Sequence, residues 1–255
     1  MSTAEQRLSG AATRSGATRR AESRRKRLRY GILGGTFDPP HIGHLALAQE
    51  VHARLELDRV WFVPANQPPH KAGKPISSAV DRLAMVELAI AGDDRFAVST
   101  LELVRSGPSY TADTLETLRA QWRGIEMVFM MGWDMLVYLP QWYAPERVVA
   151  AVDTLAASHR PGAPVVEDEI ERLAASVPGL REKLVVLPTP QLDVAGTTLR
   201  ERVASGLPIR YLVPDTVRRY IEEHALYASL AKQSSAHSTS GAQRTRTRRS
   251  RREVC

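Results

Sequence analysis

Residues 34–44 place two glycines and two histidines where they could bind phosphate. The stretch reads Gly-Gly-Thr-Phe-Asp-Pro-Pro-His-Ile-Gly-His and lies between an apolar run at 30–33 and a helical pattern at 45–55. Glycine allows close backbone approach to a ligand, and a helix N-terminus offers unpaired N–H groups to an anion. His41 and His44, three residues apart, can face the same anion and stabilise the charge that develops as a P–O bond breaks.

Segments with strand character alternate with helical segments along the chain. The predicted strands are 29–33, 60–63, 96–103, 127–131, 152–158 and 184–187, and the predicted helices include 43–55, 80–91, 111–122 and 213–224. This alternation predicts an α/β fold, a Rossmann-like parallel sheet with helices on both faces. The carboxyl ends of the strands then share one edge, where ligands bind. We expect residues 34–44 at that edge.

Two loops that precede helices carry further candidate ligands. Residues 66–71 read Asn-Gln-Pro-Pro-His-Lys, and the prolines stiffen a loop that delivers His70 and Lys71 to the ligand edge. Lysine is a compact, mobile cation suited to phosphate. Ser-Tyr-Thr at 109–111 opens a helix, where hydroxyls and free N–H groups either bind a carboxylate or cap their own helix.

The second half of the chain adds groups suited to ribose, a ring and phosphate. Gly132 and Asp134 follow the fourth strand, where glycine permits close approach and a carboxylate can accept from ribose hydroxyls. Trp142 either stacks on a ligand ring or packs in the core. Thr197 as a helix N-cap, with Arg200 one turn later, predicts a second phosphate site.

In sequence order, these motifs resemble those of the bacterial nicotinate-nucleotide adenylyltransferases, members of the His-x-Gly-His nucleotidyltransferase superfamily. Eleven ordered residues between a strand and a helix match far more specifically than His-x-Gly-His alone. The resemblance covers about 29–227 and implies the nucleotidyltransferase fold. It also includes Asp81-Arg82, where the arginine either reaches substrate or is an exposed helical residue.

The resemblance implies adenylyl transfer from ATP to nicotinate mononucleotide, giving deamido-NAD and pyrophosphate in NAD biosynthesis. Its implied catalytic residues are His41, His44, Lys71 and Arg200. Its implied ATP-binding residues are Gly34, Gly35, Thr36, Phe37, His41, His44, Gly132, Asp134, Arg160, Thr197 and Arg200. Its implied mononucleotide-binding residues are His70, Lys71, Tyr110, Thr111 and Trp142. We expect Mg²⁺ to arrive on the ATP phosphates and expect no protein metal site.

Two positions depart from the family pattern. Trp133 stands where the family has a small residue, and Ala195 stands where serine is usual. Trp133 alters the shape of the local pocket. The loss of the serine at position 195 predicts weaker ATP affinity. Substrates within the same superfamily stay open, namely nicotinamide mononucleotide and phosphopantetheine. A class I tRNA synthetase shares His-x-Gly-His, but this chain is too short and lacks a Lys-Met-Ser-Lys-Ser loop.

The net charge of +7 is unevenly distributed along the 255 residues. Residues 1–28 and 230–255 each carry +6, which leaves −5 for residues 29–229. We predict two disordered basic tails around one nucleotidyltransferase domain, because the tails have little apolar surface to bury. Arg-rich tails leave open a nucleic-acid-binding protein as a different functional class, or weak nucleic-acid contact beside an enzyme.

Cysteine usage and hydropathy indicate the compartment. The single cysteine, Cys255, fits a reducing environment. Apolar runs are too short to span a membrane; the longest candidate, 127–139, contains Asp134. We therefore expect a cytoplasmic protein without membrane partners, and the sequence leaves a homo-oligomer open.

Overall fold

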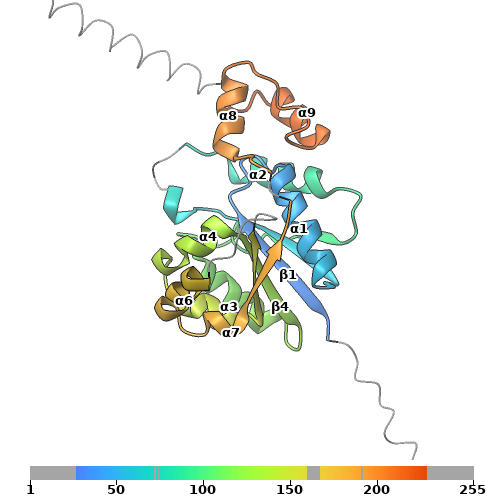
Figure 1. The fold of residues 1–255 in the computed structure, drawn as a ribbon. Coiled ribbons are helices and arrows are strands. Elements are labelled where there is room, and N and C mark those ends of the chain that lie inside the picture. The colour runs from blue at the N-terminus through green and yellow to red at the C-terminus, as the bar shows by residue number, and fades with distance from the viewer. Residues whose placement is uncertain (1–26, 72, 74, 160–166, 191, 229–255) are drawn as a thin grey trace, which may run out of the picture.

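The fold is a twisted sheet with helices packed on both faces (Figure 1). The computed structural model describes residues 27–71, 73, 75–159, 167–190 and 192–228. Its six strands are all parallel, in the order β3-β2-β1-β4-β5-β6. The predicted Rossmann-like α/β class is therefore confirmed. The predicted tails 1–28 and 230–255 lie almost entirely outside the described residues, so the domain boundaries stay predictions.

Five of the six predicted strands agree with the structure to within two residues at each end. The strands are β1 (Arg29–Gly35), β2 (Arg59–Pro64), β3 (Phe96–Val98), β4 (Glu126–Gly132), β5 (Thr154–His159) and β6 (Leu184–Pro188). The prediction for 96–103 is wrong beyond Val98, because the chain leaves the sheet and Leu101 packs into the core. This turn also buries Glu102, so apolar residues at 101 and 103 do not mark a strand.

The helices include every predicted one and several that the sequence analysis did not specify. They are α1 (Ile42–Arg54), α2 (Ala79–Ile90), α3 (Thr111–Gln121), α4 (Trp133–Tyr138), α5 (Pro145–Ala151), α6 (Glu167–Ser176), α7 (Leu180–Lys183), α8 (Gly196–Ala204) and α9 (Asp215–Glu223). Short 3₁₀ turns span Pro69–Lys71 and Leu139–Gln141. Within the described residues, no helix is long and apolar enough to cross a membrane.

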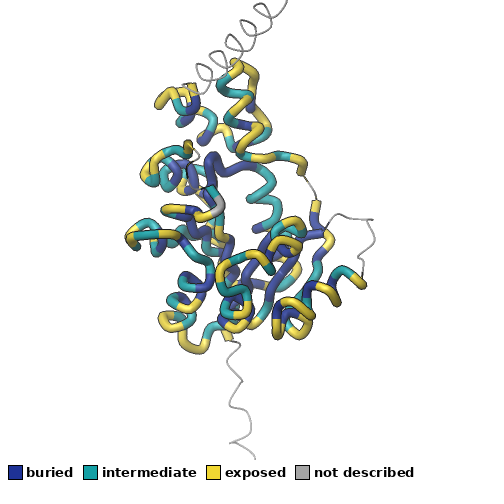
Figure 2. Tube along the Cα trace, turned by 90° about the vertical axis from the view of Figure 1, so that its left-hand side faces the viewer, coloured by how far each residue is buried: buried dark blue, intermediate teal, exposed yellow. Residues whose placement is uncertain are grey.

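Two buried clusters cover the two faces of the sheet. Helices α1 and α2 pack on one face, where Val51 and Val86 meet the strand residue Phe62. Helices α3 to α7 pack on the other face, where Leu115 meets the strand residue Phe129. Figure 2 shows the buried residues concentrated in this body. This packing confirms helices on both faces and holds the carboxyl ends of the strands along one edge.

Helices α8 and α9 form a third packing unit above that edge (Figure 1). Its small core joins Leu199, Val217 and Ile221 to Met85 of α2. The unit is also fastened by hydrogen bonds to α1 and α2, including one from the Ile42 N–H to the Leu212 carbonyl at 3.1 Å. The C-terminal segment therefore rests directly on the start of α1.

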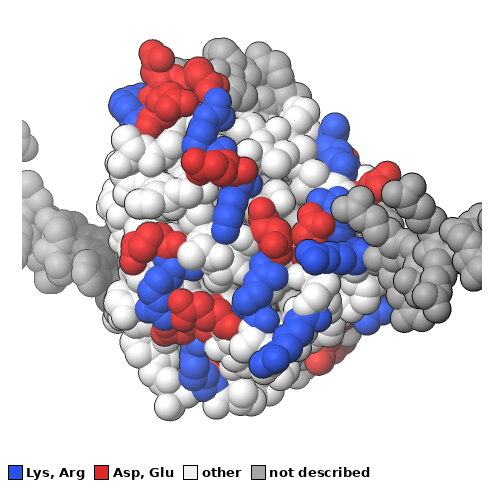
Figure 3. All heavy atoms as spheres, turned by 90° about the horizontal axis from the view of Figure 1, so that it is seen from below, with Lys and Arg blue, Asp and Glu red and all other residues white. Residues whose placement is uncertain are grey.

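The opposite edge of the sheet carries interleaved charges. Arg29 and Glu126 begin β1 and β4 and pair at 2.8 Å, and Arg119 pairs with Asp153 just before β5 at 2.6 Å. Figure 3 shows blue and red side chains mixed across this lower face. The charges on this face therefore alternate in sign, and the Arg-rich tails that left nucleic-acid binding open lie almost entirely outside the described residues.

Candidate active site

The turn between β1 and α1 places the two motif histidines at the carboxyl edge of the sheet. β1 and β4 are neighbours at the point where the strand order reverses, which is where open α/β sheets bind ligands. Phe37 adopts a φ of 51° and is 1% exposed. Its ring is therefore part of the core, and only its backbone remains for a ligand. His41 then serves as N-cap of α1.

The imidazoles of His41 and His44 are stacked, with ring centroids 3.7 Å apart. The His41 backbone N–H donates to Nδ1 of His44 at 3.2 Å. Because Nδ1 accepts, the proton of neutral His44 lies on Nε2. Among the residues that the structure describes, the buried Nδ1 of His41 has no hydrogen-bond partner.

Gly43 leaves room for this stacking. A Cβ at position 43 would lie 3.1 Å from Nδ1 of His41, tighter than an ordinary contact. The glycine of the His-x-Gly-His motif therefore gives the His41 ring room to lie over α1. The sequence predicts phosphate binding by this stretch, and the structure adds a packing role for its glycine beside His41.

Burial sets the protonation of both histidines. It lowers the pKa of His41 to about 4. The pKa of His44 is also lowered, first by burial and then by the positive charges of His41 and Lys71. Both imidazoles are therefore neutral at pH 7 before substrate binds. An anionic ligand would favour their charged forms, so the pair can gain positive charge as phosphate arrives.

The free energy of unfolding should fall as the pH drops below 6.5. The unfolded imidazoles keep a pKa near 6.5, whereas folded His41 has a pKa of about 4. The unfolded state then binds more protons across this window, and stability is lost as pH decreases through it. At 1.36 kcal/mol per unit, His41 contributes roughly 3 kcal/mol. Thermal melts between pH 7 and 4 test this: His41→Asn should reduce the pH dependence while the part due to His44 remains, and an unchanged slope would contradict it.

The start of α8, where the sequence predicts a second phosphate site, meets the same turn. The Arg200 guanidinium donates to the Asp38 carbonyl at 2.7 Å and to the Thr197 hydroxyl at 3.2 Å. A Cβ at Gly196 would lie 2.9 Å from that carbonyl, so glycine permits the approach. The N-cap is Ala195, which has no side-chain cap hydrogen bond, so the prediction of Thr197 as N-cap is wrong. Thr197 and Arg200 nevertheless lie beside the histidine turn.

Arg82 organises the loops at this edge from below. Its guanidinium is 1% exposed and donates to four carbonyl oxygens, which belong to Thr36, Ala65, Asn66 and Ser77. The alternative of an exposed helical arginine is therefore wrong, whereas contact with substrate stays a prediction. Arg82 holds the loops after β1 and β2 together. The positive charge of Lys71 contributes to the lowered pKa of His44. The loop after β2, which ends in Lys71, therefore lies near the histidine pair.

The segment before α3 is linked to the loop after β2. The Ser109 hydroxyl accepts from the backbone N–H groups of Asn66 and Gln67 at 3.0 and 3.2 Å. Ser109 therefore does not cap its own helix, whose N-cap is Tyr110 with Thr111 as the first helical residue. The link sets the Ser-Tyr-Thr segment beside the loop that ends in Lys71.

An aromatic pair continues this wall of the site. The rings of Tyr110 and Tyr143 lie 4.3 Å apart. Trp142, next to Tyr143, makes an edge contact with Phe129 of β4 at 6.3 Å and packs partly into the core. The structure thus gives Trp142 a packing role on one side of its ring. Tyr110 and Trp142, predicted to bind the mononucleotide, are brought close through Tyr143, which the sequence analysis missed.

The remaining predicted residues lie after β4 and β5. Gly132 ends β4, and Asp134 is exposed on the first turn of α4. A Cβ at position 132 would lie 2.6 Å from the Asp134 carboxylate, so that side chain folds over the glycine. Trp133 makes an edge contact with His159 at 4.7 Å. Arg160 lies outside the described residues, as does the rest of its turn; for His70 only the backbone is described.

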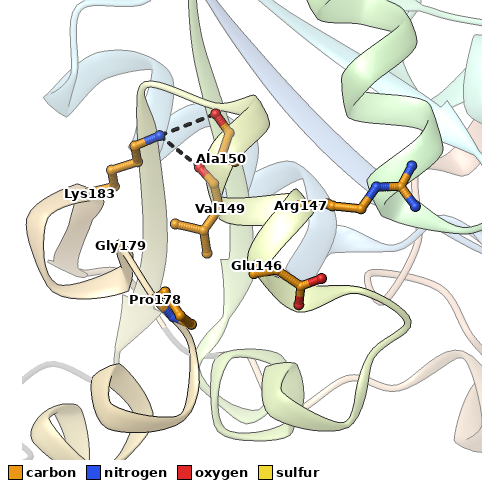
Figure 4. Close-up of a pocket in the computed structure, with 7 residues that line it drawn as sticks. All are labelled: Glu146, Arg147, Val149, Ala150, Pro178, Gly179 and Lys183. Carbon is orange, nitrogen blue, oxygen red and sulfur yellow. Dashed lines mark hydrogen bonds between the residues drawn. The ribbon is translucent and has the colours of Figure 1, made fainter.

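A separate hollow lies between α5 and α7 (Figure 4). The Lys183 amine donates to the carbonyls of Val149 and Ala150 at 2.9 and 3.3 Å and so caps the end of α5. The predicted site residues do not line this hollow. Within the described residues there is also no group of three or more His, Cys, Asp or Glu side chains that could hold a metal.

Comparison with known proteins assigns the class. Residues 32–202 match the cytidylyltransferase-like family model, and the chain belongs to that class of nucleotidyltransferases. A probable nicotinate-nucleotide adenylyltransferase of Thermomicrobium roseum is 44% identical over 79% of this chain and 92% of its own length. One from Dehalococcoides mccartyi is 44% identical over 78% of this chain and 97% of its own. The protein is a member of the nicotinate-nucleotide adenylyltransferase family.

Solved structures agree on the fold. Plasmodium falciparum nicotinic acid mononucleotide adenylyltransferase complexed with NaAD superposes with a TM-score of 0.63 at 20% identity. The match covers 79% of this chain and 98% of that one. At this identity the likeness supports the arrangement of strands and helices.

Proposed function

We propose that this enzyme transfers the adenylyl group of ATP to nicotinate mononucleotide, giving deamido-NAD and pyrophosphate in NAD biosynthesis. The observation that carries the proposal is the stacked, neutral pair of His41 and His44 beside Arg200, at the switch point of the sheet. Relatives 44% identical over most of the chain are named for this activity. Their names support nicotinate mononucleotide over the other acceptors that the sequence left open.

The reaction needs positioning and charge stabilisation more than a protein nucleophile. The 5′-phosphate of the mononucleotide attacks the α-phosphorus of ATP, and the bond from that phosphorus to pyrophosphate breaks. His41 and His44 would donate to the α-phosphate and to the departing pyrophosphate. Arg200 with Thr197 would hold the β- and γ-phosphates, and Lys71 would place the attacking phosphate.

The mononucleotide and the adenosine take opposite sides of the switch point in this proposal. Tyr110, Thr111 and Trp142, on the side of α3, would hold the nicotinate ring and carboxylate. Gly132 and Asp134, at the end of β4, would hold the ribose of ATP. Mg²⁺ would bind with the ATP phosphates as part of that substrate. The cytoplasmic location and the oligomeric state stay predictions.

Pyrophosphate release by the full chain, with ATP and Mg²⁺, tests the function. Nicotinate mononucleotide, nicotinamide mononucleotide and phosphopantetheine are compared as acceptors at equal concentration. We expect the highest kcat/KM with nicotinate mononucleotide, because the Ser-Tyr-Thr segment offers N–H and hydroxyl donors for its carboxylate. Higher kcat/KM with either other acceptor, or no turnover with any, would overturn the proposal.

A further inference from the structure

Tyr227 connects the C-terminal segment to the histidine turn. Its hydroxyl donates to Oδ1 of Asp38 at 2.8 Å, across 189 residues of sequence. The side chain is 8% exposed and belongs to the small core of α8 and α9. Its φ of 69° lies in the left-handed region, which is unfavourable for a residue other than glycine. A buried residue in this conformation that is also hydrogen-bonded to the histidine turn is a candidate functional position.

The acceptor of this bond is a fully buried carboxylate. Oδ2 of Asp38 accepts from the Ser77 N–H at 3.2 Å, and the Asp38 side chain is 0% exposed. Burial, then the charge of Asp38, raises the pKa of Tyr227. The hydroxyl therefore stays protonated and remains a donor. A buried carboxylate that lost this donor would have to find another.

Arg200 is the cation best placed to take over. Its guanidinium lies 3.8 Å from Oδ2 of Asp38, yet it donates to the backbone carbonyl of the same residue at 2.7 Å. Arg82 also acts on Asp38 through its charge, but its donors already serve four carbonyls. A small rotation would let Arg200 pair with the carboxylate instead of facing the nucleotide site.

We propose that Tyr227 is a positioning residue of the ATP site: by donating to Asp38, it keeps Arg200 directed at the ATP phosphates. This inference rests on the proposed role of Arg200 in ATP binding. Tyr227 does not touch substrate. Without the Tyr227 hydroxyl, the Asp38 carboxylate attracts the Arg200 guanidinium away from the ATP phosphates. The β- and γ-phosphates then lose a ligand, while the mononucleotide side of the site is unchanged.

The test compares Tyr227→Phe with Tyr220→Phe in the full chain. Tyr220 is a matched control, because its hydroxyl also ties the C-terminal unit to a carboxylate, that of Asp81 at 3.0 Å, away from the site. Calorimetric titration with MgATP alone should show about tenfold weaker binding for Tyr227→Phe. Tyr220→Phe should stay within twofold of wild type. Equal ATP affinity in the two variants would overturn the proposal.

Steady-state kinetics distinguish a specific effect on Arg200 from a general loosening of the whole active site. In Tyr227→Phe, the KM for ATP should rise about tenfold while the KM for nicotinate mononucleotide changes less than twofold. Equal increases in both would indicate loosening and overturn the proposal. The ATP titration needs no second substrate, so a wrong acceptor would overturn the proposed function without affecting this result.

A double variant tests whether the effect passes through Arg200. On an Arg200→Ala background, Tyr227→Phe should cause no further loss of ATP affinity. An additional tenfold loss would contradict the proposed route. If Tyr227→Phe does not fold, Asp38→Asn removes the carboxylate charge and keeps an acceptor for the Tyr227 hydroxyl. Arg200 would then have no competing anion, so ATP affinity equal to or above wild type is expected, and a tenfold loss would refute the competition.

Discussion

Replacing His44 by alanine should lower kcat about 100- to 1000-fold, with a much smaller change in the KM for nicotinate mononucleotide. This is the usual effect of removing one preorganised donor to charge that develops in the transition state. Pyrophosphate release measures it directly. His52→Ala is the matched control, because His52 lies in the last turn of the same helix. It should keep wild-type turnover.

Two amide substitutions at the same position test which nitrogen acts. Nδ1 of His44 accepts from the His41 N–H, so Nε2 carries the proton. A glutamine amide nitrogen can reach the Nε2 position, whereas an asparagine amide reaches only the Nδ1 position. His44→Gln should therefore keep at least tenfold more activity than His44→Asn. The reverse order would show that the tautomer, or the role of Nε2, is wrong.

Replacing Arg82 by alanine should lower the free energy of unfolding by about 3–5 kcal/mol, because four buried carbonyls lose their shared donor. For a chain of this size the melting temperature should fall by roughly 10 °C. ATP affinity should also fall, since Thr36 and Asn66 lie at the start of the two loops, after β1 and β2, that frame the proposed site. Thermal denaturation and ATP titration measure the two effects.

Arg54 provides the comparison for that loss. Its ion pair with Glu50 is a single-turn contact on α1, at 45% exposure of the arginine side chain. Arg54→Ala should change stability by less than 1 kcal/mol. Arg82→Lys should resemble Arg82→Ala more than wild type, because an ammonium lacks the planar fork that reaches four carbonyls. A melting temperature for Arg82→Ala within 2 °C of wild type would refute the assignment.

The sequence specified the sheet well because its strands are short buried runs between clear helices. The glycines and histidines of residues 34–44 were placed correctly, since strand, turn and helix follow one another without a gap. The local sequence pattern predicted too long a strand at 96–103. There the chain turns off the edge strand after Val98, and Glu102 is buried against the Thr114 hydroxyl at 2.7 Å. A buried carboxylate paired across 12 residues leaves no periodic signal.

The site was predicted as separate motifs, but its internal connections were not. The local sequence pattern is compatible with an exposed Arg82 on its helix. Only the fold shows that four carbonyl oxygens surround its guanidinium. The sequence gives Asp38 no role beyond its place in the motif. In the structure, Tyr227 and Arg200, both far along the chain, donate hydrogen bonds to it. Such contacts depend on how the C-terminal unit docks, which composition and spacing do not encode. The roles assigned to these side chains in catalysis stay predictions.

The bond between Tyr227 and Asp38 also has a consequence for synthesis of the chain on the ribosome. Domains emerge from the N-terminal end first, so the histidine turn, β1 and α1 leave the exit tunnel long before Arg200 and Tyr227. The sheet can be completed once β6 (Leu184–Pro188) has emerged. On the roles proposed for Arg200 and Tyr227, high ATP affinity must wait for about 40 more residues. A nascent chain released early would hold a nearly complete sheet but bind its nucleotide poorly.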